Sequence, residues 1–136
     1  MDKISIADFD VCTSFLIPKG GHVSEQKLKY GKGNFYFSSY GCLSGRVTSR
    51  RDDLISLLYM VLFLKKGDFE FMGIKTRNFT PNKLARIKKE NTKPYLMTMK
   101  DASFREFAKE ILSLGFSDTP DYEKLRHLLR CIIWSP

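Results

Sequence analysis

The sequence has few cysteines, no long apolar run and a deficit of acidic residues. Its three cysteines, Cys12, Cys42 and Cys131, lie far apart and form no C-x-x-C pair. This pattern argues against a disulfide framework and against a zinc site, because both need closely spaced ligands. His22 and His127 have no cysteine, aspartate or glutamate at metal-ligand spacing. We therefore expect reduced thiols and no bound metal.

No apolar stretch reaches the length of a membrane span. The longest, LISLLYMVLFL at 54–64, has eleven residues and is typical of a buried helix. The first residues are mixed and acidic, unlike the basic and then apolar layout of a signal peptide. These features predict an intracellular protein, cytoplasmic or nuclear, with no membrane partner.

Acidic residues are outnumbered, since 15 Asp and Glu stand against 23 Lys and Arg and give a net charge of +8. Such an excess favours polyanionic partners, including nucleic acid, acidic protein surfaces and phosphorylated protein, without selecting one of them. Basic and aromatic residues alternate around Tyr30 and 35–37, but no nucleic-acid reading motif is present. A solvated basic surface is the simplest interpretation.

The length of 136 residues and the apolar periodicity predict one mainly α domain over 1–136. We expect a short strand at 4–7, a long polar loop at 16–34 and an extended or irregular stretch at 35–48. Residues 1–45 would thus contain the strand and this loop-rich region, and 46–136 would form the helical core.

Capping signals in the sequence predict where the helices begin and end. Ser49 is expected to cap a helix with Asp52 and Asp53 in its first turn, and this helix ends at 65–67 with two lysines and a glycine. Because 54–64 is apolar nearly all round, we expect protein to surround it. A short basic helix is predicted after Thr80, and an amphipathic helix from about 103 to 114. A last helix opens at 119–121, with inward positions predicted at Tyr122, Leu125, Leu128, Leu129 and Ile132.

The run SRRDDL at 49–54 resembles the casein kinase 1 family, in which it opens the central helix of the kinase C-terminal lobe. Three further segments follow in the order of the family. IADFDVCTSF (6–15) resembles the strand that carries Asp-Phe-Gly, GNFYFSSYGCLSG (33–45) the end of the activation segment, and LGFSDTPDYEKLRHLL (114–129) the closing helices. The resemblance covers 4–133 and implies a kinase C-terminal-lobe fold; the vaccinia-related kinases are a close sister family.

Catalytic parts of a kinase are expected to be missing. A glycine-rich loop, a nucleotide-binding lysine and a catalytic aspartate all precede the Asp-Phe-Gly aspartate in kinases. Only seven residues precede Asp8, so we expect no N-terminal lobe, no catalytic loop, no cofactor and no activity of the chain alone. Asp10 replaces the glycine, which predicts a vestigial Asp8 that caps local backbone amides and binds no magnesium. Mg-ATP is expected only if another polypeptide completes the site.

The resemblance also assigns site residues. Ser49, Arg51 and Asp53 have structural roles in the family, where the equivalent of Asp53 anchors the backbone of the catalytic loop. Here we expect Asp53 to cap its own helix, with contact to another polypeptide as the alternative. Tyr36 replaces an anion-binding arginine of the family, so a preference for phosphate-primed substrates is not expected. Gly115 replaces the arginine of the Leu-Arg-Phe motif, so the structural contact that this arginine makes in the family is not expected either.

A lobe without its usual cover should expose an apolar edge at Ile4, Ile6 and Phe9 and a patch around Phe15, Leu16, Phe35 and Phe37. The residues predicted to bind a partner are Lys27, Lys29, Lys32, Phe35 and Phe37. Anionic contacts are also expected from the helix residues Lys83, Arg86, Lys88 and Lys89.

Three functions follow from these patterns. The favoured one is a non-catalytic, pseudokinase-like C-lobe module that acts as a structural or scaffolding subunit in a hetero-complex. The alternative is half of a split or truncated casein kinase 1-like Ser/Thr kinase that is completed in trans. A basic nucleic-acid-binding module is the weaker alternative.

Overall fold

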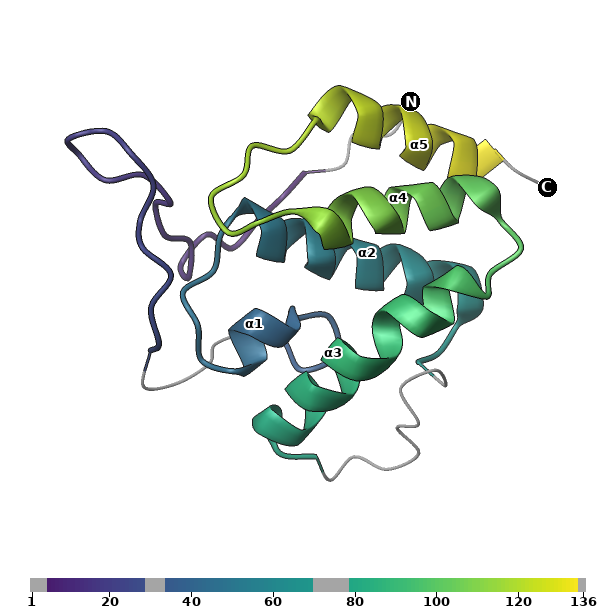
Figure 1. Ribbon diagram of the computed structural model, residues 1–136, viewed down its shortest axis with the longest axis horizontal. Helices are drawn as coiled ribbons and strands as arrows, with labels where there is room; N and C mark the ends of the chain where they lie inside the picture. The colour runs from purple at the N-terminus through teal and green to yellow at the C-terminus, as the bar shows by residue number, and fades with distance from the viewer. Residues whose placement is uncertain (1–4, 29–33, 70–78, 135–136) are drawn as a thin grey trace.

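The structure is a computed structural model that describes residues 5–28, 34–69 and 79–134. Its described part contains five helices: α1 (Tyr40–Leu43), α2 (Arg50–Lys66), α3 (Pro81–Met97), α4 (Ala102–Ser113) and α5 (Tyr122–Trp134). Helix α4 packs on α2, α3 and α5, and α3 also packs on α1 (Figure 1). The mainly helical fold that the sequence predicts is therefore confirmed.

Helix α2 begins and ends at the predicted signals. The Ser49 N–H donates to Asp52 Oδ2 at 3.0 Å, which is one half of a capping box. The reciprocal contact of the Ser49 hydroxyl does not reach hydrogen-bond geometry. At the other end, Gly67 adopts a left-handed φ of 81°, and its N–H donates to Phe63 O at 2.7 Å. A side-chain cap at one end and a left-handed glycine at the other thus define the length of this helix.

The later helices also have N-terminal caps, which were predicted at Thr80 and at 119–121 and not at Asp101. Thr80 Oγ1 accepts from the Lys83 N–H at 3.4 Å, Asp101 Oδ1 from the Phe104 N–H at 2.9 Å, and Asp121 Oδ1 from the Lys124 N–H at 3.0 Å. Helix α3 is longer than expected and continues through Pro94 to Met97. In α5, Leu125 and Ile132 are buried, but Tyr122 is 45% exposed, so its predicted inward position is wrong.

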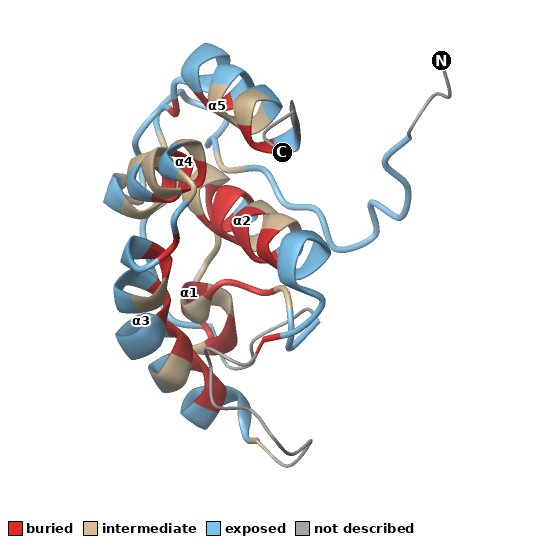
Figure 2. Cartoon of the chain, turned by 90° about the vertical axis from the view of Figure 1, so that its right-hand side faces the viewer, coloured by how far each residue is buried: buried red, intermediate tan, exposed pale blue. Residues whose placement is uncertain are grey.

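The N-terminal third differs from the expectation. Residues 5–7 form no strand, and Ile4 lies outside the described residues. The β pairing found in the described N-terminal part consists of isolated bridges, Leu16 to His22 and Lys27 to Arg46. Alternating apolar residues at 4–7 favour a strand only when a neighbouring strand offers its backbone groups. Figure 2 shows this exposed segment running from the helical body into solvent.

The core lies where α2, α3 and α4 meet. Leu58, Tyr59 and Leu62 of α2, Leu96 of α3 and Phe104 of α4 are fully buried. The Tyr59 hydroxyl lies 3.0 Å from Thr92 Oγ1, so both buried polar groups are satisfied. No helix within the described residues is both long and apolar enough to cross a bilayer.

We predict that Gly67→Ala lowers the free energy of unfolding by about 1 kcal/mol, because alanine resists the left-handed backbone. A Cβ at this position would meet no atom within 4 Å, so the loss would come from the backbone alone. Urea denaturation of the domain measures this loss. Gly67→Asn is the matched variant and should cost less, since asparagine tolerates positive φ. Equal losses for both variants would contradict the explanation.

Candidate functional site

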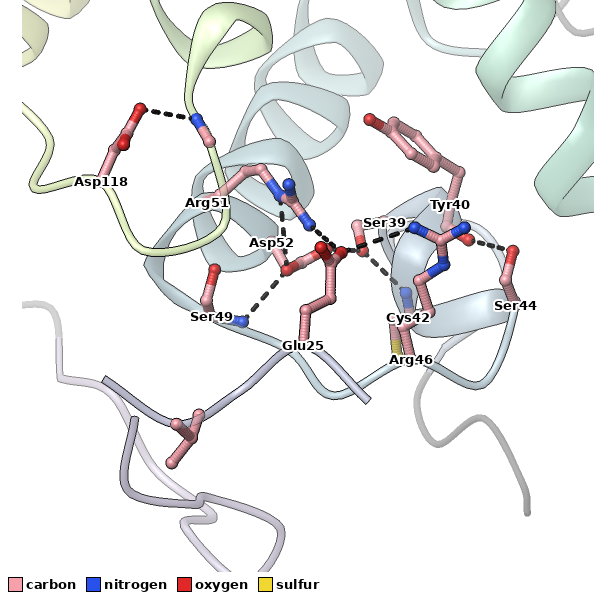
Figure 3. A network of polar contacts seen from close by, with 12 residues as sticks. Glu25, Ser39, Tyr40, Cys42, Ser44, Arg46, Ser49, Arg51, Asp52 and Asp118 are labelled. Carbon is pink, nitrogen blue, oxygen red and sulfur yellow. Dashed lines mark hydrogen bonds and ion pairs between the residues drawn. The ribbon is translucent and has the colours of Figure 1, made fainter. Parts of the chain in front are cut away.

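Asp52 is the polar centre of the region that begins α2 (Figure 3). Its Oδ1 accepts from the Ser39 hydroxyl at 2.6 Å, and its Oδ2 accepts from the Ser49 N–H at 3.0 Å. The Ser39 hydroxyl in turn accepts from the Cys42 N–H at 3.0 Å and so caps α1. One carboxylate that is 3% exposed therefore connects the N-termini of two helices.

Gly41 makes this close approach possible. A Cβ on Gly41 would lie 2.8 Å from Asp52 Oδ1, a separation that real Cβ atoms essentially never show. Helix α1 was not predicted, because four residues are too few to display a periodic apolar pattern. Its formation depends on the cap at Ser39 and on the absence of a side chain at position 41.

Arg51 connects α2 to the N-terminal segment. Its Nη2 lies 3.0 Å from Glu25 Oε1, and its Nε lies 3.8 Å from Asp52 Oδ2. The hydrogen bond from Arg51 is the main cause that lowers the pKa of Glu25, and Arg46, 3.5 Å away, adds to it. The resemblance gave Arg51 a structural role, and the structure places it in this ion-pair network.

A different contact joins α2 to the loop that contains Gly115. Arg50 Nη2 donates to Ser117 O at 3.1 Å, and the Gly115 N–H donates to Asp118 Oδ2 at 2.7 Å. A Cβ on Gly115 would lie 3.1 Å from the Asp118 carboxylate oxygens. The arginine expected from the family pattern at position 115 is thus absent, and Arg50 supplies a contact to this loop from the helix side.

Asp53 does not cap its helix. Among the described residues its carboxyl group has no hydrogen-bond or ion-pair partner, and Asp52 makes the capping contact in its place. Residue 53 is exposed as a whole, yet neighbouring protein removes part of the water around its carboxyl group. This partial burial, followed by the nearby Asp52 charge, raises the pKa of Asp53.

An apolar stripe continues from Asp53 along α2. Positions 57, 60 and 64 follow residue 53 at helical spacing and lie on the same face. Leu57 is half-buried, Met60 is 43% exposed and Leu64 is 76% exposed. Figure 2 shows the last turn of α2 in the exposed colour, while the side toward the core is buried. The expectation that protein surrounds this helix is therefore wrong for the described residues.

Asp8 lies in a turn of the exposed N-terminal segment. Its φ of 65° is the only positive value of a non-glycine residue in the described chain, and the Cys12 N–H donates to Phe9 O at 2.9 Å. Neither Asp8 nor Asp10 has a hydrogen-bond or ion-pair partner among the described residues, so the predicted amide cap is not seen. No group of three or more potential metal ligands occurs in the described residues.

Aromatic side chains form a pocket of about 450 Å³ between the segment at 35–38 and the end of α2. Tyr36 stacks on Phe69 with 6.1 Å between ring centroids, and Phe37 makes edge contacts with Phe63 and Phe69 at 5.7 Å. Phe35 is 51% exposed beside them. Of the predicted patch, Leu16 and Phe35 are therefore exposed, whereas Phe15 and Phe37 are half-buried.

The basic residues have several environments. Lys27 is exposed, whereas Lys29 and Lys32 lie outside the described residues. On α3, Lys83, Arg86 and Lys89 are exposed as predicted. Lys88 is fully buried, so its predicted role as an anionic contact is wrong. The helical phase of Lys88 places it with Leu84 and Thr92 on the buried face.

Comparison with known proteins identifies relatives of this fold. The chain is 29% identical over 138 residues to Casein kinase I homolog RAG8 of Kluyveromyces lactis, covering 97% of this chain and 25% of that protein. It is 26% identical over 139 residues to Casein kinase I homolog 2 of Saccharomyces cerevisiae, covering 97% and 25%. A probable casein kinase I homologue of Encephalitozoon cuniculi is 30% identical, covering 98% and 43%. The chain is related to the casein kinase 1 family.

These matches confirm the kinase C-lobe-like character of the helical domain. The chain spans a quarter of the length of the two yeast relatives and less than half of the microsporidian one. No protein-family profile matches the chain. The casein kinase 1 relationship therefore establishes the origin of the domain, and its biochemical role has to be argued from its own residues.

We predict that Asp52→Asn lowers the free energy of unfolding by about 1–3 kcal/mol, because an amide cannot accept both buried hydrogen bonds. Urea denaturation of the domain measures the loss. Ser39→Ala is the companion variant and should lose about 1 kcal/mol through the α1 cap and the same carboxylate. Since both changes act on one hydrogen bond, their costs should not add in the double variant. Full additivity would contradict the network.

Proposed function

We propose that this domain is a non-catalytic, pseudokinase-like C-lobe module that scaffolds a larger assembly by accepting further polypeptide on the exposed face of α2. Asp53 is the observation that carries the proposal. Its carboxyl group is partly desolvated and has no donor among the described residues. Backbone N–H groups of an added segment would satisfy it, as the resemblance to the casein kinase 1 family implies for the catalytic loop.

The apolar stripe beside Asp53 supports the same role. Met60 and Leu64 would gain hydrophobic stabilisation from a covering segment, since removing apolar surface from water contributes roughly 25 cal/mol per Å². Ile6, Phe9 and Val11 are 83%, 62% and 68% exposed in the N-terminal segment. So many exposed large apolar side chains in a domain of this size favour a partner over a free monomer.

The exposed positive charge on α3 favours a partner with an acidic surface. Lys83, Arg86, Lys89 and Lys93 are exposed on α3, where Glu90 is the only acidic residue. None of these four cations has an ion-pair partner among the described residues, whereas Arg51, Lys65 and Lys124 do. The unpaired cations would attract an acidic protein surface and would do so less at high salt.

A second candidate function is completion in trans to a casein kinase 1-like kinase. The left-handed backbone of Asp8 favours it, because an unusual φ at a family metal position is a feature of functional sites. In this case the partner would supply the nucleotide-binding parts, and Asp8 would face Mg-ATP. The exposed N-terminal segment is accessible to such a partner.

We predict that Asp53→Asn raises the melting temperature of the isolated domain at pH 7. The pKa of Asp53 is raised, so folding favours its neutral form. That contribution is present below the ordinary pKa of 3.8 and is lost as the pH rises through the raised value. The gain from asparagine should therefore be seen at pH 7 and disappear near pH 3. A lower melting temperature at pH 7 would show that Asp53 has a stabilising contact within the domain.

The docking role is tested with a defined probe, the part of Casein kinase I homolog 2 that precedes its matched region. We expect this segment to bind the domain in titration calorimetry and to suppress the binding of an apolar dye. Asp53→Asn and Leu64→Lys should each weaken binding about tenfold or more, which corresponds to about 1.4 kcal/mol. Ile133→Lys on α5 is the matched control, since Ile133 is 67% exposed away from the stripe, and should bind normally.

A monomer that binds neither the dye nor the probe would overturn the docking role. Titration of the complex with a fluorescent ATP analogue and Mg²⁺ distinguishes the two candidates. Nucleotide binding that is lost in Asp8→Asn would establish the completed kinase. A complex that forms without binding nucleotide would establish the scaffold.

A further inference from the structure

The aromatic pocket at the C-terminal end of α2 combines four rings with one carboxylate. Its volume of about 450 Å³ lies within the range of small-molecule sites. The described residues that line it are Tyr36, Phe37, Phe63, Gly67, Asp68 and Phe69. None of these residues is basic and Asp68 is the acidic one, although the chain as a whole has a net charge of +8. A ligand in this pocket would therefore meet aromatic rings and a negative charge.

The rings of the pocket stand in two main directions, like walls that meet at a corner. Tyr36 and Phe69 are nearly parallel, with 12° between the ring planes and 6.1 Å between the centroids. Phe37 is turned by 66° from Phe69 and by 86° from Phe63, with its centroid 5.7 Å from each. Tyr36 is 43% exposed and Phe63 is 37% exposed, so part of each ring remains open to solvent. Rings arranged in this way can contact one ligand from more than one side.

The backbone on both sides of the pocket is held in place. Lys88 is 0% exposed and contacts the segment at 35–38, which carries two of the rings. Its Nζ donates at 3.1, 2.8 and 2.7 Å to the backbone oxygens of Phe35, Tyr36 and Ser38. On the other side, the left-handed Gly67 ends α2 and turns the chain toward Phe69. The walls are therefore formed before a ligand arrives, which lowers the entropic cost of binding.

An organic cation fits this lining better than an anion does. The face of an aromatic ring attracts a positive charge, and the carboxylate of Asp68 attracts it as well. The neighbouring cations do not line the pocket, since Lys66 is exposed on the last turn of α2 and Lys88 is held by the backbone oxygens. A plain ammonium is strongly hydrated and would lose hydrogen bonds against apolar walls. A methylated ammonium loses fewer, because its methyl groups can contact the rings directly.

We propose that the aromatic pocket is a recognition site for a methylated ammonium group, the chemistry that methylated lysine side chains share with choline. The cation contacts the rings and lies near the Asp68 carboxylate, and the volume leaves room for the alkyl chain that carries it. The pocket lies at the end of α2 opposite to Asp53. This recognition is therefore separate from the docking of a polypeptide that we propose for the face of α2, and it goes beyond that role.

Nuclear magnetic resonance titrations of the whole chain test the site. The cationic probes are choline and a short peptide that contains trimethyllysine. Two matched peptides contain unmodified lysine or a neutral isostere, in which a tert-butyl group replaces the trimethylammonium. We expect the trimethyllysine peptide to shift the ring signals of Tyr36, Phe37 and Phe63 and to bind about fivefold or more tightly than either matched peptide. Tighter binding of this peptide than of choline would identify a protein side chain as the source of the cation, and the reverse would identify a small molecule.

Variants separate recognition of the cation from general packing. Tyr36→Leu removes a partly exposed wall and should weaken binding of the trimethyllysine peptide about tenfold. Tyr122→Leu is the matched control, since Tyr122 is 45% exposed on α5 outside the pocket, and it should bind as the wild type does. Asp68→Asn should weaken binding of the cationic peptide and leave binding of the neutral isostere unchanged.

The proposal is overturned if the neutral isostere binds the wild type as tightly as the trimethyllysine peptide does. It is also overturned if no probe shifts the ring signals at millimolar concentration, or if Tyr36→Leu binds normally. If Tyr36→Leu does not fold, the comparison of the three peptides on the wild type decides. Each of these results would leave the docking test on α2 unaffected, because that test measures the binding of a different probe.

Discussion

The shared carboxylate of Asp52 is the constraint on which the candidate site depends. It accepts a hydrogen bond from the N-cap residue of α2 and another from the N-cap hydroxyl of α1. Because α1 packs on α3 and α2 packs on α4, this contact fixes the relation between the two halves of the helical body. A buried acceptor with two donors tolerates little movement, since the loss of either donor would leave a charged oxygen unpaired.

The same contact explains why Asp53 remains available. Once Asp52 has taken the capping position, the next residue is turned outward by 100° and cannot reach the helix N-terminus. Its carboxyl group is left where protein removes water but offers no donor. A capping residue and the proposed docking residue thus occupy adjacent positions in one motif but have different environments.

Much of the helical fold could be predicted, because caps and apolar spacing are local signals. Ser49, Gly67, Thr80 and Asp121 mark helix ends that the structure reproduces within one or two residues. The site was harder to predict because it depends on contacts between distant segments. The burial of Lys88 needs three carbonyl groups that lie about fifty positions earlier in the chain, and no local pattern reports them. The expectation that Asp53 caps its own helix was wrong, although the spacing of a capping box, with an acceptor three residues after Ser49, indicates Asp52.

The exposed stripe on α2 has a consequence for the stoichiometry of any assembly. Two copies of the chain present the same Met60 and Leu64 side chains, so self-association and partner docking compete for one surface. A pair with parallel α2 helices would cover the apolar residues but would bring two Asp53 carboxylates together, and these would repel each other. Such a parallel pair is therefore disfavoured at the end of the stripe where the proposed partner would donate N–H groups to Asp53. Under the proposed docking role, Asp53 thus favours an unlike partner over a parallel pair of identical chains.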